Sequence, residues 1–305
     1  MVTSRSAAFR WSSCAAAVLW TAVRCVSAAA DVDAVALIVT ATGTLTVSED
    51  GREARRATAL DWLRAGAILE SPAGSTAVLA LAGGRRYEVA PRSRARVAAE
   101  GIEILAGRAR ELPRIAPLPR LGALSPDAHA GSRAGALRVR GRRLRDLYPR
   151  ADATSLAGST TLAFSSLPGV TEYHVEVEDE EGETVFHVTT RGSAVPVSPD
   201  VLRPGQRYRW SVRGNSPEGL ARGEAEFSTL DTEAVRARQQ LRASPGLADD
   251  VASLALLAEV DRNLGLMQEA RDGFARALER TPGDSALRQA LDQVESRLRE
   301  PAQSE

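Results

Sequence analysis

Short runs that alternate between apolar and polar residues, separated by glycine and proline, fill most of this chain and restrict it to antiparallel β-structure. STAVLALAGGRRYEV (residues 75–89) alternates through Ala77, Leu79 and Leu81, turns at two glycines and then resumes. Such period-two runs predict hairpins with one buried face. After Asp231 the apolar spacing becomes that of helices. The sequence therefore predicts a multidomain, mainly β protein with a short α-helical tail.

The first 30 residues have the layout of a secretory signal peptide. Arg5 and Arg10 give a positive start, residues 14–23 (CAAAVLWTAV) form an apolar run, and the small residues near Ala28–Ala30 provide a cleavage site. The run is shorter than the about 20 apolar residues that span a bilayer. We expect a periplasmic or extracellular protein that does not span the membrane.

Cleavage of this segment changes what chemistry the chain can carry. Both cysteines, Cys14 and Cys25, leave with it, so the mature chain has neither a disulfide nor a thiolate. Three arginines also leave, and 36 basic residues then face 39 acidic ones, a net charge of −3. The compartment alone argues against nucleic acid as a partner.

Residues 35–107 resemble the FecR domain of bacterial envelope proteins. The resemblance rests on the pattern between Leu63 and Ser93, LRAGAILESPAGSTAVLALAGGRRYEVAPRS. Its matching positions are Gly66, Ile68, Gly74, Ser75, Ala77, Leu79, Leu81, Gly84, Val89, Pro91 and Ser93. The resemblance implies an antiparallel β domain. The glycines are interpreted as turn residues with positive φ, because no carboxylate pair, histidine cluster or phosphate-type loop accompanies them.

Residues 108–136 are rich in proline, glycine and arginine and are predicted to form an extended linker. The arginine-rich strand that follows carries Arg138, Arg140, Arg142 and Arg143. It is interpreted as a solvated edge strand. Two alternatives stay open: a contact with an anionic lipid or cell-wall surface, or one with the acidic stretch EVEDEEGE (residues 176–183) of the next domain.

Residues 137–230, including that strand, are predicted to form an antiparallel β-sandwich. Strand-length pieces at regular spacing are separated by glycine and proline turns. Within LRPGQRYRWSVRG (residues 202–214), Tyr208, Trp210 and Val212 share one face, and the arginines between them point to water. Burial of each such side chain is worth roughly 1.5–3 kcal/mol. The paired aromatics are therefore predicted to be core residues.

The same region resembles a fibronectin type III or immunoglobulin-like module. LRPGQRY, Leu202 to Tyr208, matches the tyrosine corner of that family, in which the phenol hydroxyl bonds to upstream backbone. On the outer face, a pairing of Val175 with Phe186 would place His174 opposite His187. Two imidazoles make a weak candidate for a metal site, because a closed zinc site needs four ligands.

Residues 232–299 are predicted to be helical, and Leu254 to Asp284 resemble one tetratricopeptide repeat. Asp261 stands where a large aromatic residue is usual in that family. The matching positions are Leu254, Leu257, Ala258, Gly265, Ala270, Phe274, Ala277 and Pro282. About one and a half repeats cannot bury a continuous core. The tail must therefore pack on the sandwich, self-associate or borrow a partner, and Leu254, Leu257 and Phe274 are candidate partner-binding residues.

No nucleophile, base and acid can be assembled by spacing, so no enzyme activity, cofactor or catalytic residue is predicted. The resemblances imply a non-catalytic secreted or periplasmic protein that acts through protein–protein contacts in the cell envelope. The alternatives are a FecR-type envelope sensor or regulator, and a binding protein attached to cell-wall polysaccharide.

Overall fold

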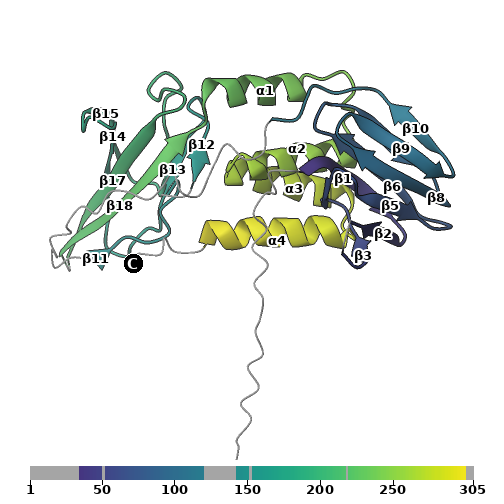
Figure 1. Ribbon diagram of the computed structural model, residues 1–305. Coiled ribbons are helices and arrows are strands. Elements are labelled where there is room, and N and C mark those ends of the chain that lie inside the picture. Colours follow the sequence, from purple (N-terminus) through teal and green to yellow (C-terminus); the bar gives the residue numbers. More distant parts are fainter. Residues whose placement is uncertain (1–33, 50–51, 120–141, 151–152, 218, 300–305) are drawn as a thin grey trace, which may run out of the picture.

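The computed structural model describes residues 34–49, 52–119, 142–150, 153–217 and 219–299. Two β units lie at the ends of the molecule, and four helices lie between them (Figure 1). Among the described residues, no helix is long and apolar enough to cross a membrane.

The first β unit consists of two five-stranded antiparallel sheets packed face to face. One has the order β10-β7-β6-β1-β4 and the other β3-β2-β5-β8-β9. The strands of the first sheet are β1 (Ala34–Thr42), β4 (Trp62–Arg64), β6 (Thr76–Leu81), β7 (Arg86–Val89) and β10 (Ala109–Leu112). Those of the second are β2 (Leu45–Ser48), β3 (Arg55–Ala57), β5 (Ile68–Ser71), β8 (Ser93–Ala98) and β9 (Gly101–Ala106). The alternating side chains of both sheets form the core between them.

One glycine turn of this unit shows why the residue is required. Gly43 has φ +76°, and a Cβ there would lie 2.5 Å from Ser75 Oγ. That hydroxyl accepts a hydrogen bond from Thr44 N at 3.0 Å and donates to Thr44 O at 3.0 Å. Any larger residue at position 43 would displace this bond and strain the turn.

The first unit extends beyond its predicted end at residue 107. β10 pairs with β7, Ile115 N donates to Gly84 O at 3.0 Å, and Leu118 N donates to Ala82 O at 2.9 Å. Ile115 and Leu118 are buried. Residues 108–119 are therefore not linker, because their apolar side chains and backbone groups find partners on the sheet. The rest of the predicted linker lies outside the described residues.

The second β unit is also antiparallel, apart from two short parallel additions. Its main sheet has the order β11-β18-β17-β14-β15, β12 pairs with β18, and β13 pairs with β16. Its strands are β11 (Arg142–Arg143), β12 (Thr154–Ser155), β13 (Thr161–Ala163), β14 (Tyr173–Glu178), β15 (Thr184–Thr190), β16 (Ala194–Pro196), β17 (Arg207–Ser216) and β18 (Gly219–Thr229).

Tyr208 and Trp210 are core residues, as predicted. Trp210, Tyr173 and Phe227 are fully buried, and the Phe164 and Tyr173 rings meet edge to face at 4.8 Å. The Tyr208 hydroxyl accepts a hydrogen bond from Arg203 N at 2.7 Å. This bond confirms the predicted contact between the phenol and the upstream backbone.

The helical unit consists of α1 (Thr232–Arg242), α2 (Val251–Asn263), α3 (Met267–Arg280) and α4 (Ser285–Arg299). Asp231 and Asp250 cap α1 and α2 by accepting hydrogen bonds from Ala234 N and Ser253 N. Helices α2 and α3 lie so close that a Cβ at Gly273 would be 2.7 Å from Ala258 Cβ. The predicted helical hairpin is therefore present.

The helices pack mainly on the first β unit. Leu37, Val39 and Ala80 lie on the outer face of the sheet that contains β1, in one buried cluster with Leu256 and Val260 of α2. The same cluster reaches Leu230 at the end of β18 and, less deeply buried, Leu156. The sequence predicted that the tail packs on the sandwich, self-associates or borrows a partner. It instead packs mainly on the first β unit, because the sheet that contains β1 has an apolar outer face.

Candidate functional site

The helical residues predicted to bind a partner are largely internal. Phe274 is fully buried and Leu254 nearly so, both in the cluster between α2, α3 and α4. Leu257 is half-buried against the first β unit. The prediction of a partner surface at Leu254 and Phe274 is wrong for this structure, because α2, α3 and α4 pack together around these side chains.

The described part of the arginine-rich segment is β11, which pairs away from the acidic hairpin. Arg138 and Arg140 lie outside the described residues. Arg142 and Arg143 form β11, which runs parallel to β18 at Ala221 and Arg222. The acidic turn instead lies at the opposite end of the sheet, where Glu178 pairs with Arg209. The described part of the segment therefore does not face the acidic stretch.

The predicted histidine pair is not formed. Val175 pairs with Val188, so His174 faces Thr189 at 3.0 Å while His187 faces Glu176. This register differs from the expected one by two residues, because Val175 was expected opposite Phe186, and a β-bulge after Val177 accounts for one of the two. Within the described ranges, no group of three or more His, Cys, Asp or Glu could hold a metal ion.

The outer face of β14, β17 and β18 carries a lattice of ion pairs. Its members are Arg209–Glu226 at 3.1 Å, Arg213–Glu176 at 3.2 Å and Arg222–Glu224 at 3.0 Å. All six side chains are about two-fifths to one-half exposed. Exposed pairs of this kind contribute little to stability. They instead place exposed side chains of both charge signs on this face.

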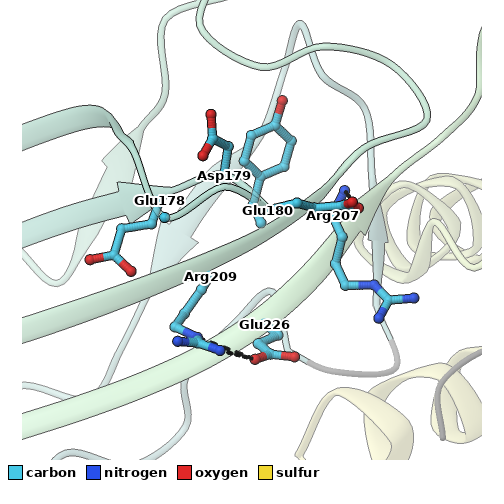
Figure 2. A pocket seen from close by; sticks show the side chains of 8 residues that line it. Glu178, Asp179, Glu180, Arg207, Arg209 and Glu226 are labelled. Carbon is cyan, nitrogen blue, oxygen red and sulfur yellow. Dashed lines mark hydrogen bonds and ion pairs between the residues drawn. The ribbon is translucent and has the colours of Figure 1, made fainter. Parts of the chain in front are cut away.

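The acidic turn borders an open hollow of about 350 Å³ at one end of this face (Figure 2). Asp179 Oδ1 accepts hydrogen bonds from Glu181 N and Glu183 N, and Glu180 accepts one from Arg207 N. These carboxylates therefore fix the hairpin. The residues that line the hollow offer carboxylates and guanidiniums for polar contacts. They include no histidine, and their single hydroxyl, the phenol of Tyr208, is held in the core.

Two buried carboxylates of α2 bind its neighbours, Glu259 at the first β unit and Asp261 at α1. Glu259 is fully buried and accepts hydrogen bonds from Trp62 Nε1 of β4 at 2.9 Å and from Arg262 at 2.6 Å. Asp261 is nearly as buried and holds Arg238 and Arg242 of α1. The charged residues inside the apolar run LALLAEVDRNLG are the sequence signal for these contacts.

Burial shifts the pKa of two further groups, Glu269 within the helical unit and Arg86 on the first β unit. Desolvation raises the pKa of Glu269 on α3, and the negative charge of Asp261 adds to that rise. Desolvation lowers the pKa of Arg86, which lies under the helical unit and donates to Gly246 O. The helices and the first β unit therefore share a buried, charged interface in addition to their apolar one.

Comparisons with known proteins do not assign a family. No family model matches the sequence, and no curated protein matches it either. Solved structures that are similar include three fibronectin domains of chicken CNTN1 (10% identity, 63% of this chain, 55% of that chain, TM-score 0.25). Others are two fibronectin type III domains of chicken tenascin (11%, 62%, 84%, 0.24) and a chain described as a myokine structure (13%, 30%, 98%, 0.24).

TM-scores of this size are too low to assign a fold to this chain. Its mainly β architecture, with several antiparallel sheets and four helices toward the C-terminus, rests on the strand pairings described above.

Proposed function

We propose that this protein is a non-catalytic scaffold of the bacterial cell envelope, exported by its signal peptide, which acts through protein–protein contacts. We further propose that its first β unit is FecR-like, its second is a fibronectin type III or immunoglobulin-like module, and its helices are tetratricopeptide-like. The residue patterns quoted for each unit support these assignments.

One observation carries the proposal: the helical unit shares a buried cluster with the first β unit and touches the second. The apolar cluster extends from Leu37 to Leu230. At the other end, the Arg150 guanidinium donates to Arg297 O of α4. A chain built this way holds two β units at a fixed spacing. That property is useful for positioning other proteins, and it leaves the charged face of the second unit open to solvent.

Site-specific crosslinking in intact cells tests this function. A photoreactive residue on the charged face, at position 211 or 224, is expected to yield adducts with particular envelope proteins. Arg213→Glu should remove these adducts without changing the melting temperature, because Arg213 is exposed. Arg288→Glu, exposed on α4, makes the same change of charge as the matched control and should leave the adducts unchanged.

Two outcomes would contradict the proposal. Crosslinks to polysaccharide alone would favour a cell-wall binding protein, and altered transcription upon deletion, without adducts, would favour a FecR-type regulator. Export is tested separately by sequencing the N-terminus of the mature chain, which should begin just after Ala28–Ala30.

A further inference from the structure

Four turns meet at one end of the first β unit. They join β1 to β2, β5 to β6, β7 to β8 and β9 to β10, and they are residues 43–44, 72–75, 90–92 and 107–108. Thr44 N donates to Ser75 Oγ at 3.0 Å, and Arg92 N donates to Pro72 O at 3.3 Å. A Cβ at Gly107 would lie 2.5 Å from Arg92 O. The four turns therefore form one continuous surface.

The charge of this turn surface is of one sign. The four turns contain no aspartate or glutamate, and their charged residues are Arg92 and Arg108. Both are exposed, and among the described residues neither guanidinium has a hydrogen bond or an ion pair. The arginines on the adjoining strands are instead paired, in Arg94–Glu70 at 3.0 Å, Arg96–Glu103 at 2.8 Å and Arg110–Glu88 at 2.5 Å. The nearby carboxylates are therefore already neutralised, and the turn surface keeps a net positive charge.

Arg92 adopts a backbone conformation that favours glycine. Its φ is +58°, in the left-handed region that few residues other than glycine, asparagine and aspartate occupy. Residues held in such strained conformations cluster at ligand-binding sites. The strain is a second observation, independent of charge, that points to the same turn.

Two apolar side chains border the arginines. Ile104 is 41% exposed and Leu105 is 37% exposed, and the third exposed large apolar residue among those described, Leu220, lies in the other β unit. Leu105 is the residue that a β-bulge in β9 leaves without an opposite residue on β8. Such bulges redirect side chains. Two consecutive apolar side chains are therefore exposed within four residues of Arg108.

We propose that this end of the first β unit binds the surface of an anionic phospholipid membrane. Arginine binds phosphate through its planar guanidinium, and those of Arg92 and Arg108 are free to do so. Ile104 and Leu105 enter the boundary between headgroups and acyl chains, as apolar side chains of interfacial proteins do. An acidic protein would satisfy the arginines, but a hydrocarbon phase also accounts for the exposed apolar pair.

This inference rests on the proposed location in the cell envelope and goes beyond the scaffold function. β9 and β10 lie at the end of the molecule away from the second β unit (Figure 1). Membrane contact there leaves the charged face of the second unit free. Sequencing of the N-terminus tests export, the adducts from positions 211 and 224 test the scaffold, and vesicle binding tests the turn surface, so each can fail separately.

Cosedimentation with lipid vesicles tests the proposal. The chain is used without residues 1–30, because the apolar run of residues 14–23 would itself bind lipid, and every described strand and helix lies beyond them. Vesicles of phosphatidylglycerol and phosphatidylcholine in equal parts are compared with vesicles of phosphatidylcholine alone. Binding is expected to the anionic vesicles and should weaken as salt is added, because salt screens exposed charges.

Four single variants show whether the turn surface is responsible. Arg108→Ala and Arg92→Gly should each weaken binding about five-fold, because each removes one cation near the anionic surface. Arg92→Gly also relieves the strained backbone, so its melting temperature should not fall. Ile104→Ser and Leu105→Ser should each weaken binding about five-fold through the loss of apolar contact. Thermal unfolding verifies the fold of every variant.

Two exposed residues of the second β unit are the matched controls. Arg191→Ala and Leu220→Ser make the same kinds of change and should leave vesicle binding unchanged. Binding that does not depend on phosphatidylglycerol, turn variants that bind like the wild type, or controls that lose as much would overturn the proposal. A photoreactive residue at position 105 that crosslinks in intact cells to a protein and not to lipid would also overturn it, and would assign the surface to an acidic protein.

Discussion

The two β units use the outer faces of their main sheets in opposite ways. In the first unit, β1 buries Ala36, Leu37, Ile38 and Val39 in succession, so both faces of the sheet are covered. In the second unit, β17 buries every second residue and turns arginines outward. The first sheet therefore needs the helices, whereas the second stands alone with its charged face in water.

This difference shows that the pattern of apolar residues along a strand indicates how many faces of its sheet are covered. A strand with one covered face alternates, and a strand with two covered faces becomes a continuous apolar run. The run ALIV in β1 is of the second kind. It identifies the sheet on which the helical tail docks.

The largest expected effect comes from placing a charge on the covered face. Leu37→Asp should lower the free energy of unfolding by about 4 kcal/mol or more, because it removes a fully buried side chain and buries a carboxylate under α2. Thr189→Asp, on the exposed face of the second unit, should change it by less than about 0.5 kcal/mol. Urea denaturation measures both, and equal losses would contradict the comparison.

The buried ion pairs provide the next test. Asp261→Ala should cost about 3 kcal/mol, because Arg238 would keep its buried guanidinium without the carboxylate that holds it. Asp272→Ala breaks an exposed pair with Arg271 on α3 and should cost less than about 1 kcal/mol. The same denaturation experiment gives both values. A small loss for Asp261→Ala would show that water replaces the carboxylate.

Much of the fold could be predicted from short-range patterns. The aromatic core of the second unit and the bond from Tyr208 follow from alternation and from one seven-residue motif. The helical hairpin follows from apolar spacing and from Gly265, whose φ is +77°. These features depend on residues close in sequence, so local preference and packing agree.

Features that depend on distant pairs could not be predicted. The register of β14 and β15 differs from the expected one by two residues, partly because of a bulge near the turn, and this shift places His174 opposite Thr189 and His187 opposite Glu176. Leu254 and Phe274 were predicted to be accessible to a partner. The packing of α4 against α2 and α3 buries them, and that packing depends on contacts between separate helices. Asp261 stands where the repeat family usually has a large aromatic residue. Its ion-pair partners, Arg238 and Arg242, belong to another helix, so its role does not follow from the local sequence. The candidate surfaces depend on such placements, so the sequence alone did not locate them.

A moderate effect is expected where a side chain bonds the backbone of the second unit. Tyr208→Phe should cost about 1–2 kcal/mol, because Arg203 N loses its acceptor while the ring stays packed. Tyr173→Phe removes a matching bond, from Leu167 N to the Tyr173 hydroxyl at 2.8 Å, and should cost a similar amount. Thermal unfolding of the two variants compares them. A much smaller loss at Tyr208 would mean that the corner stabilises the turn mainly through its ring.

The smallest expected effect is a pH dependence at the helical joint. Burial raises the pKa of Glu269 in the folded chain above its ordinary value of 4.5, which it keeps in the unfolded chain. Between the unfolded-state pKa and the folded-state pKa, the folded chain therefore binds more protons than the unfolded chain. The contribution of Glu269 to stability is therefore greatest at low pH and falls as pH rises through the folded-state pKa. Glu269→Gln should match the wild type below pH 4.5 and exceed its stability at neutral pH by less than about 1 kcal/mol. Glu279→Gln, exposed on the same helix, is the control, and an equal gain there would assign the effect to net charge rather than to burial.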